Sequence, residues 1–336
     1  RILVRKGLAA MNAKPRAGVA ELLARQGLTG KKIGTTEISW QISPAINATG
    51  RMGKPETAVR LLLSRDQAER NRISADVIQM NTDRKQLGSD SWVIVEPLAR
   101  ESLEKHNSNL VIAASDAIHR GVTGIMANRL ASCFKVPAVV VCFMPDGTAV
   151  GSMRSARGLH LDSLLEPCAD LFIDHGGHAF AAGFSLPRER YDEFASRIKR
   201  LSADISFPDT EDDGEISVDA ELPHEFLTPA LLELADKFEP YGEGNDQLTF
   251  MTKRMRIMTA DIMGKTEKQH LKLTFDCGKY KWPAIFWQAA ERLNRDFAVG
   301  DCVDAVFQVN RNTFNGAEIP QMILQDVQRQ EATPTR

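Results

Sequence analysis

Two adjacent glycines followed by a histidine, Gly176-Gly177-His178, constrain the backbone more tightly than any other segment of the chain. Paired glycines remove side chains where a backbone must come close to something. The small residues 181–183 that follow predict a tightly packed helix, and glycine amides at a helix N-terminus form a cradle for phosphate. His178 would complete that cradle. The plainer alternative is a glycine turn that ends one element and opens a packed helix.

The segment from residue 89 to residue 186 alternates between strand-like and helix-like patterns, which is typical of an α/β domain. Apolar runs between turn residues indicate the strands, and apolar residues three or four apart indicate the helices. The predicted strands are 92–95, 109–114, 137–143 and 149–154, and the predicted helices are 122–135, 161–168 and 191–203.

Helical patterns also precede this domain. Residues 1–12 and 19–25 are predicted to form short helices, whereas residues 35–53 are rich in turn and loop residues. From residue 55 to 88, apolar residues recur at helical spacing with charges between them, which predicts a long connector helix. A polar stretch at 64–66 predicts one break in it.

After residues 204–214, which resemble a linker, the pattern changes to short strands separated by glycine or asparagine turns. Five such strands in about 80 residues predict a small barrel of the OB type. The predicted fold is therefore α/β, with a connector helix, a mixed-sheet domain and then a β-barrel. The predicted barrel strands are 249–257, 269–276, 281–287, 302–308 and 321–325.

Strand alternation predicts which barrel residues face the core. It places Leu271, Leu273 and Phe275 on one face and Lys272 on the other, where the lysine could contact a backbone phosphate. Aromatic residues here have two possible roles, because they can stack on bases or fill the core. The residues with both options are Tyr280, Trp282, Phe286 and Trp287.

The net charge of −2 hides an uneven distribution of charge along the chain. Fourteen lysines and arginines stand against five acidic residues in 1–72, and eight stand against three in 251–281. An excess of basic residues favours binding to a polyanion. A helix face exposed to water is the alternative, because it can show the same excess. In 211–240 one basic residue stands against ten acidic ones, which indicates a linker or a surface for a protein partner.

Cysteine use and hydropathy limit the environment of the chain. Its five cysteines are odd in number and form no CxxC pair, which argues against disulfides or a zinc site and favours a reducing cytoplasm. The longest apolar run, Val136–Met144, is too short to cross a bilayer, so no membrane association is expected.

Several ordered motifs resemble those of DHH-type phosphoesterases and, among them, the RecJ-type exonuclease family. The glycine–histidine motif and the residues after it resemble the signature of the DHH-associated domain. The resemblance runs over nearly the whole chain, and the ordered set is more specific than any single motif. The other matching segments are Pro44–Arg51, His119–Leu130, Gly151–Ser155, Glu239–Asn245 and His270–Leu273.

The resemblance implies metal-dependent hydrolysis of phosphodiester bonds, with Mn or Mg held by aspartates and histidines of an N-terminal domain. No Asp-His-His sequence occurs here, and residues 1–8 resemble the segment just after the last metal-binding aspartate. The chain itself is therefore expected to bind no metal. The implied parts are a phosphoesterase-domain remnant (1–54), the connector helix (55–88), the DHH-associated domain (89–205) and an OB-fold domain (215–336).

The best candidates for phosphate binding lie in two motifs. Arg154 is predicted to end a strand between Ser152 and Ser155, and a guanidinium with nearby hydroxyls suits phosphate. The alternative is an ordinary surface strand end. Gly176 and Gly177 would present backbone amides. His178 is the catalytic candidate, which would contact the scissile phosphate and stabilise charge in the transition state. A helix-start histidine bonded to a backbone carbonyl is the alternative.

Four further residues are candidates for nucleic-acid contact. His119 precedes a predicted helix and could approach the same cleft, or it could be an ordinary loop residue. Asn47 and Arg51 lie in a polar loop, where Asn47 could fix the loop and Arg51 could reach the nucleic acid. Lys272 would extend the track onto the barrel. Ala45 stands where the family usually has arginine, a natural ligand for a terminal phosphate, so the sequence leaves a preference for a 5′-phosphate open.

The resemblance implies a single-stranded-DNA-specific exonuclease that acts 5′ to 3′ in DNA repair and recombination. This chain would hold the DNA and lack the metal site, and a single-strand-binding protein is a candidate partner. Two alternatives remain open. One is a phosphodiesterase for short oligonucleotides or cyclic dinucleotides, whose relatives generally lack the barrel. The other is a non-catalytic single-strand-binding scaffold.

Overall fold

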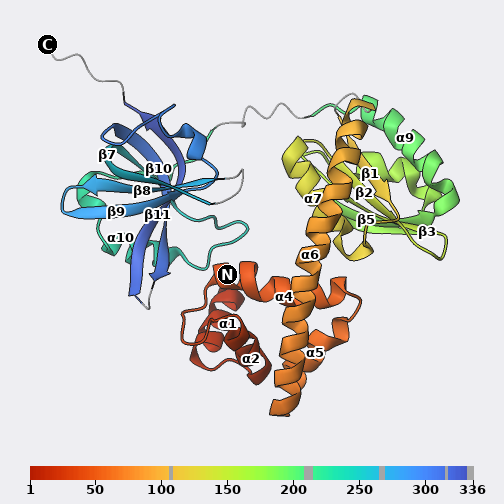
Figure 1. Ribbon diagram of the computed structural model, residues 1–336, viewed down its shortest axis with the longest axis horizontal. Coiled ribbons are helices and arrows are strands. Elements are labelled where there is room, and N and C mark those ends of the chain that lie inside the picture. Colours follow the sequence, from red (N-terminus) through yellow and green to blue (C-terminus); the bar gives the residue numbers. More distant parts are fainter. Residues whose placement is uncertain (106–108, 208–214, 265–268, 315–316, 331–336) are drawn as a thin grey trace. The chain divides into compact units, whose positions relative to one another are not determined.

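The chain forms two compact units, one made of residues 8–213 and the other of residues 1–7 together with 214–336 (Figure 1). Each unit has its own hydrophobic core. No helix in the described part of the chain is both long and apolar enough to cross a membrane. The computed structural model describes residues 1–105, 109–207, 215–264, 269–314 and 317–330.

Short helices open the chain and share one core. Leu22, Leu61 and Val77 are at most 1% exposed at its centre. The helices at 1–12 and 19–25 were predicted correctly from apolar spacing. The short helices are α1 (Ile2–Ala13), α2 (Ala17–Arg25), α3 (Thr35–Glu37), the π-helix η1 (Ile38–Ile42), α4 (Ser43–Arg51) and α5 (Pro55–Leu63).

The expectation that residues 35–47 are turn-rich was wrong, because they form α3, η1 and most of α4. The Glu37 carboxylate accepts a hydrogen bond from the Gly34 N–H at 2.8 Å, which caps the first of these helices. Pro44 lies in the first turn of α4, where a missing N–H costs nothing. Glycine and proline are common in turns, but here Gly34 and Pro44 lie at the starts of helices.

Helix α6 (Gln67–Lys105) follows a break at Ser64–Asp66, as the sequence predicted. The Asp66 carboxylate accepts from the Glu69 N–H at 2.6 Å and caps the new helix. The helix was expected to end near residue 88 and a strand to follow at 92–95. Both expectations were wrong, because α6 continues through this stretch.

The apolar residues of 92–95 belong to a helix because burial there recurs every three or four residues. Ser91, Val95 and Ala99 are at most 3% exposed, and Val95 and Ala99 pack in the core between α6 and the sheet. A four-residue apolar run is compatible with either a strand or a buried helix face. The burial of Ser91 and Ala99, four residues before and after Val95, shows that the run is part of a helix.

A mixed five-stranded sheet, in the order β1-β2-β3-β5-β4, forms the centre of the α/β part. Strands β1 and β2 are parallel, and the other pairs are antiparallel. Helices α6 and α7 cover one face, and α8 and α9 cover the other. The elements are β1 (Val111–Ser115), η2 (Arg120–Val122), α7 (Thr123–Phe134), β2 (Ala138–Phe143), β3 (Thr148–Arg154), α8 (Asp162–Leu165), η3 (Glu166–Leu171), β4 (Asp174–His178), β5 (Ala181–Pro187), η4 (Arg188–Arg190) and α9 (Tyr191–Ala203).

The helix expected after His178 is absent, because residues 174–187 form the hairpin β4–β5. Small residues allow close approach in a sheet as well as in a helix. Gly151 on β3 lies directly against the Phe184 ring of β5, where any side chain would overlap that ring. Within the small-residue run, Ala182 lies in close contact with Gly177 of β4, so the run contributes to packing between strands.

The smaller unit is a closed barrel in which β7-β8-β9-β11-β10 returns to β7, as predicted for an OB fold. Strands β9 and β11 are parallel, and the other barrel pairs are antiparallel. The expected linker 204–214 lies mostly outside the described residues. The elements are β6 (Ala220–Glu221), η5 (His224–Phe226), α10 (Ala230–Phe238), β7 (Thr249–Met263), β8 (His270–Cys277), β9 (Tyr280–Phe286), η6 (Ala290–Arg292), β10 (Cys302–Phe314) and β11 (Ala317–Arg329).

Burial separates the barrel aromatics into two groups. Trp282 and Phe286, which could have stacked on bases, are 2% and 6% exposed and belong to the core. Tyr280 packs against that core. Trp287 is 54% exposed. Strand alternation was correct for Leu271, Leu273 and Phe275, which are fully buried, and for the exposed Lys272.

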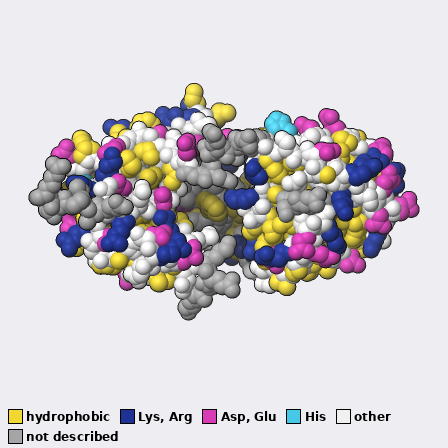
Figure 2. All heavy atoms as spheres, turned by 90° about the horizontal axis from the view of Figure 1, so that it is seen from above, with side chains coloured by type: hydrophobic (Ala, Val, Ile, Leu, Met, Phe, Trp, Pro, Cys, Tyr) yellow, Lys and Arg dark blue, Asp and Glu magenta, His cyan; other side chains and the backbone are white. Residues whose placement is uncertain are grey.

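Charged side chains of both signs are interspersed on the face of each unit shown in Figure 2. Such mixing is typical of a solvated surface.

Candidate nucleic-acid interface

Most of the predicted phosphate-binding residues lie on one face of the sheet, near the ends of β3, β5 and β4. Directly paired residues of antiparallel strands project to the same face. Arg154 and His178 are separated by two strand spacings, roughly 10 Å in total, and only a methyl group lies between them. We call the two rows of paired residues on this face the strip. Its two rows are Ser152–Gly183–Gly176 and Arg154–Ala181–His178.

The two glycines of the motif have different functions in this strip. A Cβ on Gly177 would lie 2.6 Å from the Ala182 Cα and 2.9 Å from its Cβ, so a side chain would push β4 away from β5. A Cβ on Gly176 would meet nothing within 4 Å. Gly177 therefore allows the hairpin to close, and Gly176 leaves bare backbone on the open face.

The sequence predicted that the N-terminus of a helix after His178 would lie at this site. The helix that begins here is α7 instead. A Cβ on Gly124, in the first turn of α7, would lie 3.0 Å from Arg154 Nη2. Arg154 Nη1 donates to the Met153 carbonyl at 2.7 Å, which fixes the guanidinium across the sheet. The first turn of α7 contains no acidic residue. The positive end of the helix dipole thus adds to the charge of Arg154.

Ser152 contacts α7 through its hydroxyl. The Thr123 and Ser152 hydroxyl oxygens are 3.0 Å apart, and Thr123 donates its proton to the Arg120 carbonyl at 3.0 Å. Ser152 therefore donates to Thr123 in this arrangement. Its hydroxyl must rotate before it can donate to a phosphate.

Helix α4 reaches the same site through the loop before α7. Arg51 Nη1 donates to the Gly121 carbonyl at 3.2 Å, and a Cβ on Gly121 would overlap the Arg51 carbonyl oxygen. His119 Nδ1 accepts from the Gly121 N–H at 3.1 Å. That bond fixes the tautomer with hydrogen on Nε2, and this exposed N–H is available as a donor.

Three arginines from three elements converge here: Arg51 of α4, Arg84 of α6 and Arg154 of β3. Burial, followed by the nearby charge of Arg51, lowers the pKa of Arg154, and the same two causes lower the pKa of Arg84. Among the described residues, no carboxylate forms an ion pair with any of the three. The cluster is a concentration of positive charge that an anion would stabilise.

Arg84 was not identified from the sequence, although a signal for it exists. Val77, Arg84 and Ser91 are spaced by seven residues, so Arg84 lies on the buried stripe of α6. Its Nη2 donates to Asn81 Oδ1 at 2.6 Å, while its buried Nε has no hydrogen-bond partner in the described part of the chain. A charged residue on the apolar stripe of a helix is a sequence signal for a binding site.

Four other residues named from the sequence lie elsewhere or contribute less. The Ser155 hydroxyl donates to the Leu159 carbonyl and so stabilises the turn after β3. Asn47 is exposed one helical turn before Arg51. Ala45 is fully buried in the core of the short helices. Lys272 belongs to the other unit, so it is considered with the barrel.

The described residues do not fit a metal centre. No group of three His, Cys, Asp or Glu side chains that could hold a metal ion occurs among them. The converging arginines would repel a divalent cation and attract an anion. The arrangement of charge at this site is thus better suited to an anion than to a metal ion.

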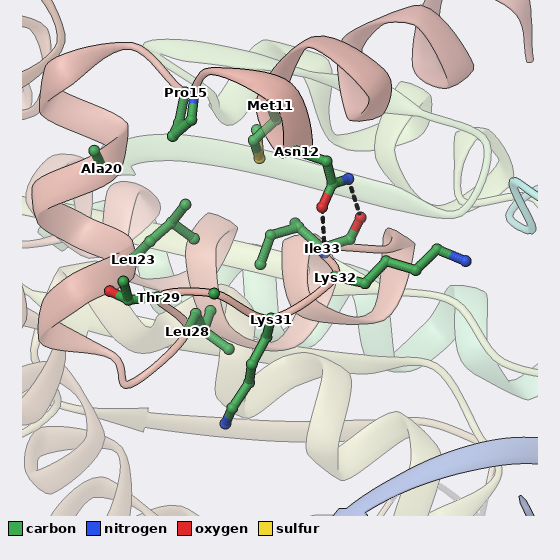
Figure 3. Close-up of a pocket in the computed structure, with 11 residues that line it drawn as sticks. Met11, Asn12, Pro15, Ala20, Leu23, Leu28, Thr29, Lys31, Lys32 and Ile33 are labelled. Carbon is green, nitrogen blue, oxygen red and sulfur yellow. Dashed lines mark hydrogen bonds between the residues drawn. The ribbon is translucent and has the colours of Figure 1, made fainter. Parts of the chain in front are cut away.

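A separate hollow of about 530 Å³ lies between α1, α2 and the segment after α2 (Figure 3). Asn12 holds that segment in place, since it donates to the Ile33 carbonyl at 2.9 Å and accepts from the Ile33 N–H at 2.7 Å. Lys31 and Lys32 are its charged lining residues. None of the predicted site residues lines it, so it is distinct from the interface on the sheet.

Known proteins resemble the chain over the same two parts. Residues 107–204 match the DHHA1 domain family, and residues 218–326 match the RecJ OB domain family. The chain is 28% identical over 335 residues to the single-stranded-DNA-specific exonuclease RecJ of Dickeya dadantii, covering 97% of this chain and 57% of that protein. For RecJ of Thermus thermophilus the identity is 30% over 253 residues, covering 75% of this chain and 35% of that protein.

The fold agrees with these similarities. The crystal structure of RecJ from Thermus thermophilus in complex with Mn²⁺ matches 98% of this chain and 46% of that one, with a TM-score of 0.75 and 26% identity. The chain thus spans between about a third and three fifths of the length of these relatives. With a DHHA1 domain followed by a RecJ OB domain, and with the fold of RecJ over nearly its whole length, the chain belongs to the RecJ family of DHH proteins.

Proposed function

We propose that this chain is the DNA-holding part of a single-stranded-DNA-specific exonuclease that acts 5′ to 3′ in DNA repair and recombination in the cytoplasm. The observation that carries the proposal is the convergence of Arg51, Arg84 and Arg154 without a carboxylate partner among the described residues. A backbone phosphate supplies the missing negative charge.

Each residue of the strip has a proposed role. The Arg154 guanidinium holds a phosphate from the sheet side, and Arg51 and Arg84 add charge from α4 and α6. His119 donates through Nε2. His178, at the edge strand, contacts the scissile phosphate and stabilises its charge in the transition state. In the whole enzyme, single-turnover cleavage by His178→Ala tests this role, since the cleavage rate should fall while affinity for DNA changes little.

The hydrolytic step needs more than this chain. Related RecJ structures contain Mn²⁺ or Mg²⁺, whereas the residues described here do not fit a metal centre. We therefore assign to this chain the binding of the strand and not its cleavage. The RecJ OB domain favours an exonuclease over a phosphodiesterase for short oligonucleotides or cyclic dinucleotides. A single-strand-binding protein is a candidate partner.

Fluorescence anisotropy of the chain with labelled single-stranded DNA, and separately with a duplex, tests the proposal. We expect tighter binding to the single strand, and affinity that falls as salt rises because phosphate contacts release counterions. We expect no cleavage of the DNA by this chain when Mn²⁺ is added. Preference for the duplex, or affinity that is independent of salt, would contradict the proposal. Cleavage at the rate of an intact RecJ would contradict the assignment of chemistry to other residues.

Replacing Gly121 by alanine should weaken single-strand binding about 3-fold to 10-fold without any change of charge. The added methyl overlaps the Arg51 carbonyl oxygen, so α4 must move away from the loop before α7 and carry Arg51 with it. Such a displacement removes part of one charge-assisted contact, which is worth about 1 kcal/mol. The affinity of Gly121→Ala in the same anisotropy titration measures the effect.

Gly50→Ala is the matched control for this substitution. Gly50 lies in α4 directly before Arg51, and a Cβ there would meet nothing within 4 Å. We expect parent affinity for Gly50→Ala. Equal affinities for the two variants would mean that the contact between α4 and the loop does not position Arg51 for binding.

A further inference from the structure

The barrel has one face on which the fold itself favours nucleic acid. Its strand order identifies β8 and β9 as the second and third strands of an OB fold. The outer surface of these two strands is where OB folds bind oligonucleotides. Side chains that project outward from β8 and β9 are therefore placed for such contact.

Trp287, the residue directly after β9, differs from the other tryptophan of the barrel. Trp282 is 2% exposed and donates its indole N–H to the Leu227 carbonyl at 2.8 Å, whereas Trp287 is 54% exposed. Stacking a base on the exposed ring would remove apolar surface of both groups from water, which is favourable. Base stacking on such a ring is tolerant of sequence, because every base has a π-face.

Trp287 is also held in position before any ligand arrives. Its ring lies edge-to-face with the His270 ring, with 4.8 Å between centroids and an interplanar angle of 80°. His270 Nδ1 accepts from the Gln288 N–H at 2.9 Å, so the backbone beside Trp287 is tied to β8. A side chain that is already ordered loses less entropy when it binds.

A cation lies at the right distance along the same surface. Lys272 is two residues beyond His270 on β8, projects to the same face, and is exposed. Two residues along a strand span about 7 Å. Asp261 of β7 is directly opposite Lys272, but no ion pair joins the two. The Lys272 ammonium can therefore contact a phosphate next to a base on Trp287.

We propose that Trp287, backed by His270, is a stacking platform for a base of single-stranded nucleic acid, with Lys272 contacting the adjoining phosphate. This proposal rests on the proposed function, because it places a second contact for the same strand on the barrel. A protein partner is the other class of ligand for an exposed tryptophan. The cation beside it and the position on β8 and β9 favour nucleic acid.

Anisotropy with labelled oligothymidylate tests the platform on the full chain. Trp287→Ala should weaken binding about 5-fold to 100-fold, the range found when one stacking contact is lost. Trp287→Phe should recover most of the affinity. Val299→Ala is the control, since Val299 is 55% exposed in the same unit, and we expect it to bind as the parent does.

An oligonucleotide of the same length without bases separates stacking from other contacts. The parent chain and Trp287→Ala should bind it equally. If Trp287→Ala loses the same factor with the abasic strand, or binds oligothymidylate like the parent, the platform is wrong. If Arg154→Ala still weakens binding in that case, the proposed function stands without the platform. If the parent chain binds no single strand, both proposals fail.

Discussion

Replacing Arg154 by alanine is expected to weaken the binding of single-stranded DNA by about 10-fold to 100-fold. Hydrogen bonds to a charged group contribute about 1.5–3 kcal/mol, which corresponds to this range. The Arg154 guanidinium is fixed by the Met153 carbonyl and lies near the positive end of α7. No other described cation projects from the sheet face into the strip. Anisotropy titration with a labelled single strand at one salt concentration measures the loss.

Two further variants show whether the loss is specific. Arg65→Ala removes the same charge from an exposed position more than four helical turns from Arg84, and its affinity should change less than twofold. Arg154→Lys keeps the charge but loses the planar fork, so an intermediate affinity is expected. Equal losses for Arg154→Ala and Arg65→Ala would show that only net charge matters.

Stability provides an independent check on the same residue. The pKa of Arg154 is lowered by burial and by Arg51, so the folded state disfavours its charge. We expect the unfolding temperature of Arg154→Ala to equal or exceed that of the parent. A marked decrease would indicate a structural role in place of ligand binding.

Replacing Trp282 by alanine should destabilise the barrel by about 3–5 kcal/mol, the usual cost of removing a large buried aromatic side chain. Trp282 is 2% exposed in the barrel core, and its indole N–H donates to the Leu227 carbonyl at 2.8 Å. The substitution leaves both a cavity and a buried carbonyl without its partner. Hydrogen exchange of peptides from β7 to β11 measures the loss in this unit alone.

Matched variants separate the two contributions. Trp282→Phe retains most of the ring but loses the hydrogen bond, so a loss of about 1–3 kcal/mol is expected. Trp287→Ala removes an exposed indole and should cost less than about 1 kcal/mol. A loss below about 1 kcal/mol for Trp282→Ala would mean that the barrel core does not depend on this side chain.

The sequence was sufficient to predict most of the strands, because their apolar runs and turn residues are local signals. It failed where one pattern fits two structures. The run at 92–95 was assigned to a strand, and only its burial together with Ala99 places it in α6. The small residues after His178 suit close packing of either kind. Pairing of residues 181–183 with both β3 and β4 makes them a strand, and the pairing with β3 involves residues distant in the sequence.

The candidate site was predicted in part. Arg154, Ser152 and His178 came from a recognised motif, and the structure brings them onto one sheet face, while their roles remain predictions. Arg84 was missed because convergence of α4, α6 and β3 is a tertiary property. Its position on the stripe of α6 was nevertheless visible, because Arg84 follows Val77 by seven residues and precedes Ser91 by seven.

The salt dependence of single-strand binding by the parent and by Arg154→Ala tests the central claim most directly. If Arg154 neutralises one backbone phosphate, the slope of log affinity against log salt should be shallower by about 0.7 in the variant. An unchanged slope with reduced affinity would mean that Arg154 contacts no phosphate. An unchanged slope with unchanged affinity would mean that the strand does not cross this face of the sheet.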